Sequence, residues 1–205
     1  MDTLFLRSIE QRISTNHFDP ARAIPDDVVR ELVRLATTAP TAYNLQNWRF
    51  IAVRDRAAKA RLRALAWNQP KVSDASVTFI VCGTRPTGGM LADRLAPSVS
   101  AGIMPAEMAD AWVQSVRQSF EDQPARQHDE AIRSATFGAA TLILAAQAMG
   151  FASSPMTGFD AEAVHAAFGL AADEFPVLLV PVGHAADGNW PRKPRRAVSQ
   201  VLELA

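Results

Sequence analysis

Three short apolar runs, far apart along the chain, set the main limit on its fold. They cover residues 48–53, 77–82 and 175–182, and they are rich in the β-branched and aromatic side chains that favour strands. So few strands, scattered between helical segments of very different length, do not fit the regular strand–helix alternation of a doubly wound sheet. The 205 residues can bury the core of one domain. The sequence therefore predicts an α+β fold and a single domain over residues 1–205.

Helical spacing of apolar residues accounts for much of the remaining chain. We expect helices over residues 3–11, 25–39, 55–67, 105–122, 124–149 and 161–168. Residues 85–102 carry three Gly and two Pro among polar residues, which predicts a loop. The long helix becomes apolar on all sides after Phe137, a pattern typical of a helix buried all round. In so small a chain this favours a subunit interface as well as a core.

Composition and motif searches exclude several classes of function. The formal net charge is zero, so nothing favours nucleic acid or an anionic membrane as the main partner. The single cysteine, Cys82, lies in an apolar run and is expected to be a buried, inert thiol. The four histidines lack metal-ligand spacing, and no G-x-G-x-x-G, P-loop or G-x-S-x-G motif is present, so no metal site is predicted. No leader or membrane-spanning run is apparent, which makes the cytoplasm the expected location.

The polar bend before the first predicted strand carries the most specific motif. Residues 39–50 read Ala-Pro-Thr-Ala-Tyr-Asn-Leu-Gln-Asn-Trp-Arg-Phe. This resembles the signature A-P-S-x-x-N-x-Q-P-W-R-F of the FMN-dependent nitroreductase family. Thr41, Asn44 and Gln46 offer a hydroxyl and two amides that suit a planar polar cofactor. Asn47 departs from the family pattern, which has proline there.

A second segment, residues 12–18, resembles the N-terminal R-R-S-x-R-x-F element of the same family. Arg12 supplies a forked cation and Ser14 a hydroxyl, and both suit a phosphate monoester. Two positions depart from the pattern. Ile13 replaces the second basic residue, and Asn16 stands where the family usually has Arg or Lys, so one positive charge near the cofactor is lost.

Three further segments follow in the family's order. Residues 68–76 resemble N-x-x-K-x-x-D-A, which implies that Asn68 meets the pyrimidine edge of the flavin and that Lys71 stabilises negative charge near N1 and O2. The run Pro155-Met156-Thr157-Gly158-Phe159 resembles the P-x-x-G-F loop that offers a backbone N–H to N5, with Thr157 in place of the frequent Glu. Lys193 and Arg195 resemble the C-terminal K-x-R element that closes on the phosphate.

The resemblance implies a mainly antiparallel sheet flanked by helices and an intertwined homodimer with FMN at its interface. One subunit would supply most contacts and its partner the 40–44 stretch. The implied cofactor contacts are Arg12, Ile13, Ser14, Asn16, Pro40, Thr41, Ala42, Asn44, Gln46, Asn68, Lys71, Pro155, Met156, Thr157, Gly158, Lys193 and Arg195.

The function implied is an NAD(P)H-dependent FMN oxidoreductase that works by a ping-pong cycle. NADH or NADPH would be the donor, and a small planar acceptor such as a nitroaromatic or a quinone would be reduced. No catalytic side chain is required beyond Lys71 as a charge stabiliser, because the cofactor carries the chemistry. Two alternatives stay open: an FMN-binding or regulatory dimer without turnover, since a fold does not fix a function, and an FMN-dependent dehydrogenase of a small substrate.

Overall fold

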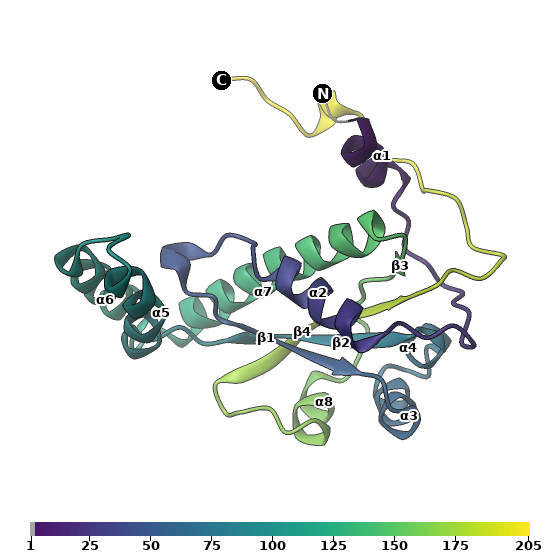
Figure 1. The fold of residues 1–205 in the computed structure, drawn as a ribbon, viewed down its shortest axis with the longest axis horizontal. Helices are drawn as coiled ribbons and strands as arrows, with labels where there is room; N and C mark the ends of the chain where they lie inside the picture. Colours follow the sequence, from purple (N-terminus) through teal and green to yellow (C-terminus); the bar gives the residue numbers. More distant parts are fainter. Residues whose placement is uncertain (1–2) are drawn as a thin grey trace.

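The computed structural model describes residues 3–205, so residues 1 and 2 of the predicted domain lie outside it. A four-stranded sheet runs through its centre in the order β1-β2-β4-β3 (Figure 1). The strands are β1 (Trp48–Val53), β2 (Val77–Thr84), β3 (Ala152–Ser153) and β4 (Glu174–Gly183). Every neighbouring pair is antiparallel. The predicted α+β class is confirmed; the two-residue β3 is an addition that was too short to read from sequence.

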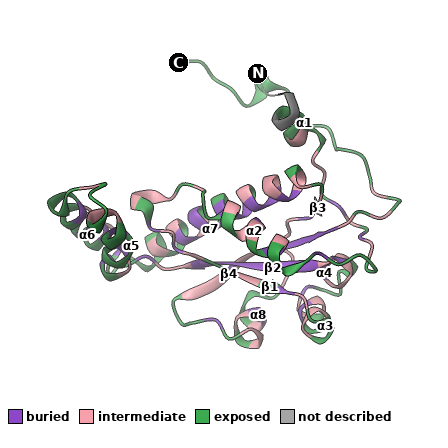
Figure 2. Cartoon of the chain, in the orientation of Figure 1, coloured by how far each residue is buried: buried purple, intermediate pink, exposed green. Residues whose placement is uncertain are grey.

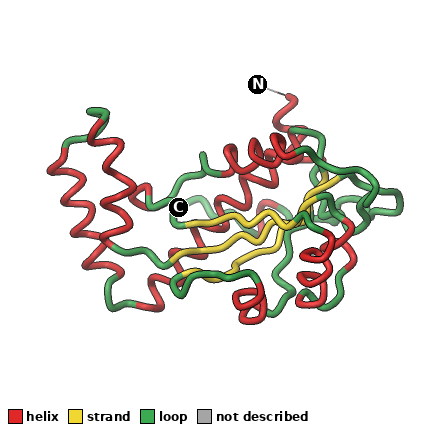
Figure 3. Tube along the Cα trace, turned by 60° about the horizontal axis from the view of Figure 1, so that its bottom comes forward, coloured by secondary structure: helices red, strands yellow, loops and turns green. Residues whose placement is uncertain are grey.

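Helices cover both faces of the sheet (Figure 1, Figure 3). They are α1 (Thr3–Gln11), α2 (Asp26–Ala36), α3 (Arg56–Leu65), α4 (Pro70–Asp74), α5 (Gly88–Ser100), α6 (Ala106–Phe120), α7 (Pro124–Ala148) and α8 (Ala161–Ala167), with 3-10 turns η1 (Ala42–Asn44) and η2 (Val198–Gln200). The alternation of β2 sorts the two faces: Phe79 and Val81 pack with α2 and α7, whereas Ile80 and Cys82 pack with α3 and α8. Because both faces are covered, β2 is apolar along almost its whole length.

The predicted loop over residues 85–102 is wrong, because the structure has helix α5 there. Its Gly and Pro residues cluster at the helix ends. Thr87 caps the first turn by accepting a hydrogen bond from the backbone N–H of Met90 at 3.1 Å, and Gly102, with φ of +68°, lies just beyond the last turn. Leu91 and Leu95 are four residues apart and buried. Helices α5 and α6 pack together through these leucines and form a helical hairpin at one end of the molecule (Figure 3).

Most predicted helices differ from the observed ones by one to three residues at an end, and one short helix was not predicted. Helix α2 ends at Ala36 and not at residue 39, because the hydroxyls of Thr37 and Thr38 donate to the carbonyls of Arg34 and Leu35 at the end of the helix. The polar stretch after α3 also contains a short helix, α4, which starts at Pro70. This places Lys71 on a helical turn rather than in an open loop.

Helix α7 is buried on one face only (Figure 2). Ala135, Ala139 and Leu142 lie in the core, as predicted for its apolar half. The opposite face is open in a single chain: the Phe137 side chain is 54% exposed. One chain therefore buries only the core face of this half, and the predicted subunit interface on the other face stays a prediction. The helix presents an apolar face that this chain leaves uncovered.

The C-terminal tail beyond β4 runs along the outside of the molecule (Figure 1), and the Arg192 side chain donates to the Glu10 carbonyl at the end of α1. Residues 191–205 are exposed throughout, including Val198, Val201, Leu202 and Leu204. Between residues 3 and 205, none of the helices combines the length and apolar character that crossing a bilayer requires. Cys82 is fully buried, as predicted, and burial raises the pKa of its thiol to about 12, which keeps it protonated.

Candidate flavin site

Three segments from distant parts of the chain meet at one end of the sheet. Ser14 forms a parallel bridge with Ser153 of β3, and the Thr15 N–H donates to the Ser153 carbonyl at 3.0 Å. The side-chain oxygen of Asn189 accepts from the backbone N–H groups of Asn16 at 2.7 Å and His17 at 3.0 Å. The N-terminal segment is therefore held between β3 and the start of the C-terminal tail.

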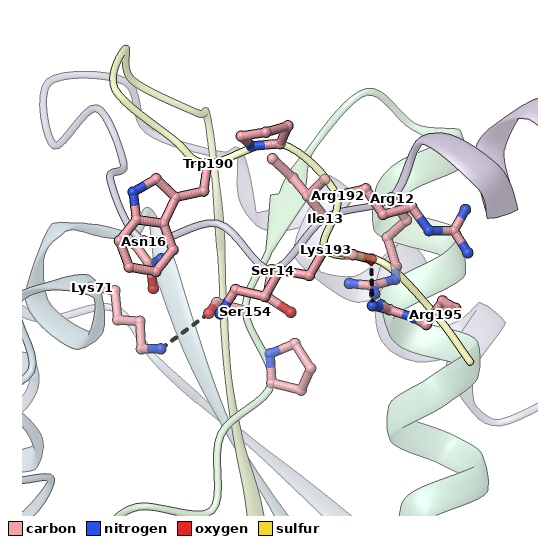
Figure 4. A pocket seen from close by; sticks show the side chains of 12 residues that line it. Arg12, Ile13, Ser14, Asn16, Lys71, Ser154, Trp190, Arg192, Lys193 and Arg195 are labelled. Atoms are coloured by element: carbon pink, nitrogen blue, oxygen red, sulfur yellow. Dashed lines mark hydrogen bonds between the residues drawn. The ribbon is translucent and has the colours of Figure 1, made fainter.

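These segments enclose a cavity of about 260 Å³, which we call the flavin pocket (Figure 4). Its lining residues are Arg12, Ile13, Ser14, Asn16, Lys71, Ser154, Pro155, Trp190, Pro191, Arg192, Lys193 and Arg195. The basic side chains of Arg12, Arg192 and Arg195 gather on one side of Ser14, whereas Lys71, Asn16 and Trp190 lie on the other (Figure 4). The pocket is thus strongly cationic at one end and mixed at the other.

The cationic end holds a guanidinium nitrogen that lacks a partner. The Arg12 Nη1 atom is buried, and no residue of 3–205 accepts a hydrogen bond from it. The pKa of Arg12 is lowered, first by burial and then by the charges of Arg195 and Arg192. A buried donor without an acceptor is costly, and nearby like charges add to that cost. A bound oxyanion would satisfy the donor and offset the repulsion.

The opposite end is marked by Lys71. Its Nζ donates to the Ser154 Oγ at 3.2 Å, and partial burial lowers its pKa. The indole of Trp190 is 63% exposed, and the Lys193 ammonium lies 5.0 Å from its ring centre. A partly desolvated ammonium is suited to stabilising negative charge on a bound ring system.

The loop predicted to pass beneath the flavin continues from this pocket. Pro155 lines the pocket, and Met156 pairs with Leu179 of β4 through two backbone hydrogen bonds at 2.9 and 3.0 Å. Gly158 lies directly under the Trp67 ring, where an added Cβ would come within 2.7 Å of that ring. A larger residue at position 158 would require the exposed Trp67 ring to move aside. Asn68, the next residue after Trp67, is exposed and adopts a φ of +57°.

The bend over residues 40–46 lies elsewhere. Pro40, Thr41 and Ala42 line a separate cavity against the first half of α7, which includes Ser134. The flavin pocket shares Ile13 with a small cavity at the other end of α7, lined by Gln147. Ser134 and Gln147 are 13 positions apart on one helix, so the two regions are separated by roughly 20 Å.

The bend is strained and tightly anchored. Tyr43, Asn44 and Gln46 all have positive φ, between 47° and 62°, which costs energy for residues other than glycine. Thr41 Oγ1 accepts from the Gln46 N–H at 3.0 Å. Leu45 is fully buried among the side chains of α5 and α6. The helical hairpin thus holds the bend in its shape.

The structure brings part of the predicted set together. Arg12, Ile13, Ser14, Asn16, Lys71, Pro155, Lys193 and Arg195 line one pocket. Four predicted residues do not line it: Met156, Thr157 and Gly158 follow Pro155 along the chain, and Asn68 precedes Lys71 by three positions. The distant bend is formed by Pro40, Thr41, Ala42, Asn44 and Gln46. Sequence reasoning missed Ser154, Trp190, Pro191 and Arg192 as lining residues. The polar Ser-Ser pair and the Trp in the basic tail were the available signals.

The charge pattern of the pocket fits FMN. A phosphate suits the end with Arg12 and its unpartnered nitrogen, and a ring that becomes negative on reduction suits the Lys71 end. Asn47 has a structural role instead: its side-chain amide donates to the Thr84 carbonyl at 2.8 Å and joins the start of β1 to the end of β2. Asn47 does not line the pocket of its own chain.

Comparisons with known proteins agree with this reading. A family model described as the nitroreductase family matches residues 9–184. The Bacillus subtilis protein YdgI, named as a candidate NAD(P)H nitroreductase, is 32% identical over 91% of this chain and 90% of its own length. The oxygen-insensitive NAD(P)H nitroreductase of Salmonella typhimurium is 29% identical over 85% of each chain. A nitroreductase candidate of Exiguobacterium sibiricum in complex with FMN superposes with a TM-score of 0.90, at 27% identity, over 98% of this chain and 97% of that one.

Proposed function

Because the chain belongs to the nitroreductase family, we propose that it is an FMN oxidoreductase that takes hydride from NADH or NADPH and reduces a planar acceptor such as a nitroaromatic or a quinone. The dependence on FMN and on NAD(P)H follows from the family and from the relatives named for these molecules. The ping-pong order and the acceptor class are our proposals. We also keep the single domain and the cytoplasmic location as predictions.

One observation supports this function above the others: a buried, unpartnered Arg12 nitrogen in a pocket with two further arginines and a lysine on the same side. That arrangement is built for a phosphate, because forked guanidinium donors match phosphate oxygens. The position of the phosphate also sets the orientation of the ligand in the pocket. A ligand whose phosphate sits at Arg12 extends toward Lys71 and the Pro155–Gly158 loop.

When bound, FMN supplies the hydride chemistry that no side chain provides. The protein's own residues bind and orient it. Arg12, Ser14, Lys193 and Arg195 hold the phosphate, and the Lys71 ammonium stabilises the negative charge that develops at the ring. Ser154 keeps Lys71 in place through the 3.2 Å hydrogen bond. Gly158 lets the backbone approach closely, because it carries no Cβ.

We further propose that two copies of the chain complete each site. The bend over residues 40–46 and the flavin pocket lie at opposite ends of α7, so one cofactor cannot contact both within one chain. A second copy in an intertwined dimer would bring its bend to this pocket. The open apolar face of α7 and the exposed apolar tail residues support that dimer, because uncovered apolar surface of this kind is typical of subunit interfaces.

The test is the visible spectrum of the purified protein before and after anaerobic NADH, and then NADPH. We expect a yellow protein that is bleached by at least one donor and recovers its colour when a quinone or a nitroaromatic is added. Flavin that binds but stays oxidised would contradict the reductase proposal and favour a binding protein or a dehydrogenase. A colourless protein that cannot be reconstituted with FMN would contradict the cofactor assignment.

A further inference from the structure

A second cationic cavity lies along α3, which we call the α3 groove. It measures about 580 Å³, larger than the flavin pocket at about 260 Å³. Arg54 and the first two turns of α3 form one wall of the groove. Helix α4 and Pro20 form the other wall. Its charged lining residues are Arg54, Arg56, Lys59, Arg63 and Asp74. Four cations therefore face one carboxylate, in a chain whose formal net charge is zero.

The cations of the groove are only partly compensated. Arg54 pairs with Asp26, and Arg63 donates to the Asn68 carbonyl at 3.2 Å and to the Ser73 Oγ at 3.0 Å. Arg56 is exposed, and no hydrogen bond or ion pair joins it to any residue between 3 and 205. The groove therefore offers one free guanidinium beside two that have already been oriented by the protein.

Lys59 is the most constrained cation in the groove. Its Nζ donates to the Ala75 carbonyl at 2.8 Å. Its pKa is lowered, first by burial, while Asp74 acts in the opposite direction and Arg54 adds to the lowering. The ammonium is thus held half-buried and close to another positive charge. An anion in the groove would offset that repulsion and restore part of the lost solvation.

We propose that the α3 groove is a second anion site, separate from the flavin pocket, that binds a phosphate-bearing small molecule through Arg56, Lys59 and Arg63. Forked guanidinium groups recognise phosphate oxygens in pairs, and the ammonium adds a point charge. The volume exceeds what a single phosphate needs, so it accepts either free phosphate or the phosphate group of a larger nucleotide. This proposal does not depend on the reductase function.

Arg63 links the groove to the flavin pocket. It contacts the Asn68 carbonyl and Ser73 on α4, the short helix that also carries Lys71. These bonds use its Nε and Nη1 atoms, so the Nη2 group remains to meet a phosphate while the two bonds hold the guanidinium in place.

The test is calorimetric titration of the FMN-loaded protein with inorganic phosphate, adenosine 2′-monophosphate and adenosine 5′-monophosphate. Loading with saturating FMN keeps the probes out of the flavin pocket. We expect Arg56→Gln to weaken phosphate binding about tenfold, as loss of one charge-assisted contact does. Arg56 has no bond to lose, so this variant should fold normally.

Arg61→Gln is the matched control. Arg61 lies on the same helix, but it stacks over the Phe168 ring at 4.8 Å and does not line the groove. The Arg61→Gln variant should bind phosphate with an affinity within about twofold of that of the unsubstituted protein. Preferential binding of the 2′-monophosphate would identify a nucleotide as the source, and equal binding of all probes would identify free phosphate. Equal losses in Arg56→Gln and Arg61→Gln, or no binding at millimolar concentration, would overturn the proposal.

Discussion

The flavin pocket and the bend over residues 40–46 are both polar, yet they are built in opposite ways. The pocket gathers exposed and half-buried side chains from three distant segments around empty space, and it leaves the Arg12 nitrogen without a partner. The bend satisfies its own polar groups, with Thr41, Asn44 and Gln46 bonded to one another, and fixes a strained backbone through buried Leu45. The pocket is suited to bind a ligand. The bend is a rigid polar surface that is suited to contact another molecule.

That difference supports our proposal that two copies of the chain complete each cofactor site. The pocket holds the charges that suit a phosphate, and the bend holds hydroxyl and amide groups that suit the rest of the cofactor. They lie at opposite ends of α7. The following predictions test whether the two regions act on the same ligand.

The largest expected effect comes from charging the open face of α7. Phe137→Asp should dissociate the dimer, because burying an unpaired carboxylate costs about 3 kcal/mol or more. If the partner's bend completes the pocket, FMN should be lost together with the dimer. Size-exclusion chromatography with flavin absorbance measures both. Phe137→Leu is the control and should keep both. Monomers that retain full FMN affinity would refute the shared site.

The second largest effect is expected from removal of one cation of the flavin pocket. Arg195→Ala should weaken FMN binding by about 2 kcal/mol, or roughly thirtyfold, because a charge-assisted contact to the phosphate is lost. The dimer should stay folded. Arg196→Ala is the control, since Arg196 lies beside it in the tail but does not line the pocket. Fluorescence titration of the apoprotein with FMN gives the affinities; full retention in Arg195→Ala would contradict the assignment of the tail.

A substitution at the other end of the pocket should change the potential more than the affinity. Lys71→Met should make the midpoint potential of the bound flavin more negative by about 30 mV, which corresponds to about 1.4 kcal/mol for two electrons. Lys59→Met removes a similar half-buried ammonium outside the pocket and should leave the potential unchanged. Dye-linked reductive titration measures both. An unchanged potential in Lys71→Met would place the ring away from Lys71.

The smallest effect should come from the bend itself. Thr41→Val removes the acceptor for the Gln46 N–H and should weaken FMN binding by about 1 kcal/mol, or roughly fivefold, in the dimer. Thr41→Ser keeps the hydroxyl and should restore binding. Thr38→Val serves as the control, because Thr38 bonds to the end of α2 outside the bend. An effect on thermal stability without any effect on FMN would mean that the bend acts only in folding.

Local patterns predicted the parts of the fold that depend on local physics. The sequence predicted β1 over the residues where the structure has it, and Asp55 caps α3 by accepting from the Ala58 N–H at 2.9 Å. Helix α5 was missed because Gly and Pro count against a helix wherever they stand, although here they lie near its ends. The apolar half of α7 was assigned to a core and a subunit interface together, because composition does not say which face meets the core and which is left for a partner.

The pocket could be predicted only as a set of separate segments. The basic pattern at Lys193 and Arg195 indicated phosphate contacts, whereas Trp190 and Arg192 of the same tail match no position of the family's K-x-R element. The clamp made by Asn189 joins positions 173 residues apart, and such a contact depends on the completed fold. Spacing along the chain does not encode it. The unpartnered nitrogen of Arg12 is likewise a property of burial, which emerges only when three segments have converged.

The anchoring of the bend through Leu45 has a consequence for how this protein could be redesigned. Leu45 contacts no predicted cofactor group, yet it connects the bend to Leu91, Leu95 and Val113 of the hairpin. Repacking of those hidden positions would tilt the bend while every contacting side chain stays the same. A mutant library directed at α5 and α6 could therefore alter which acceptors are accommodated without altering the residues that touch them.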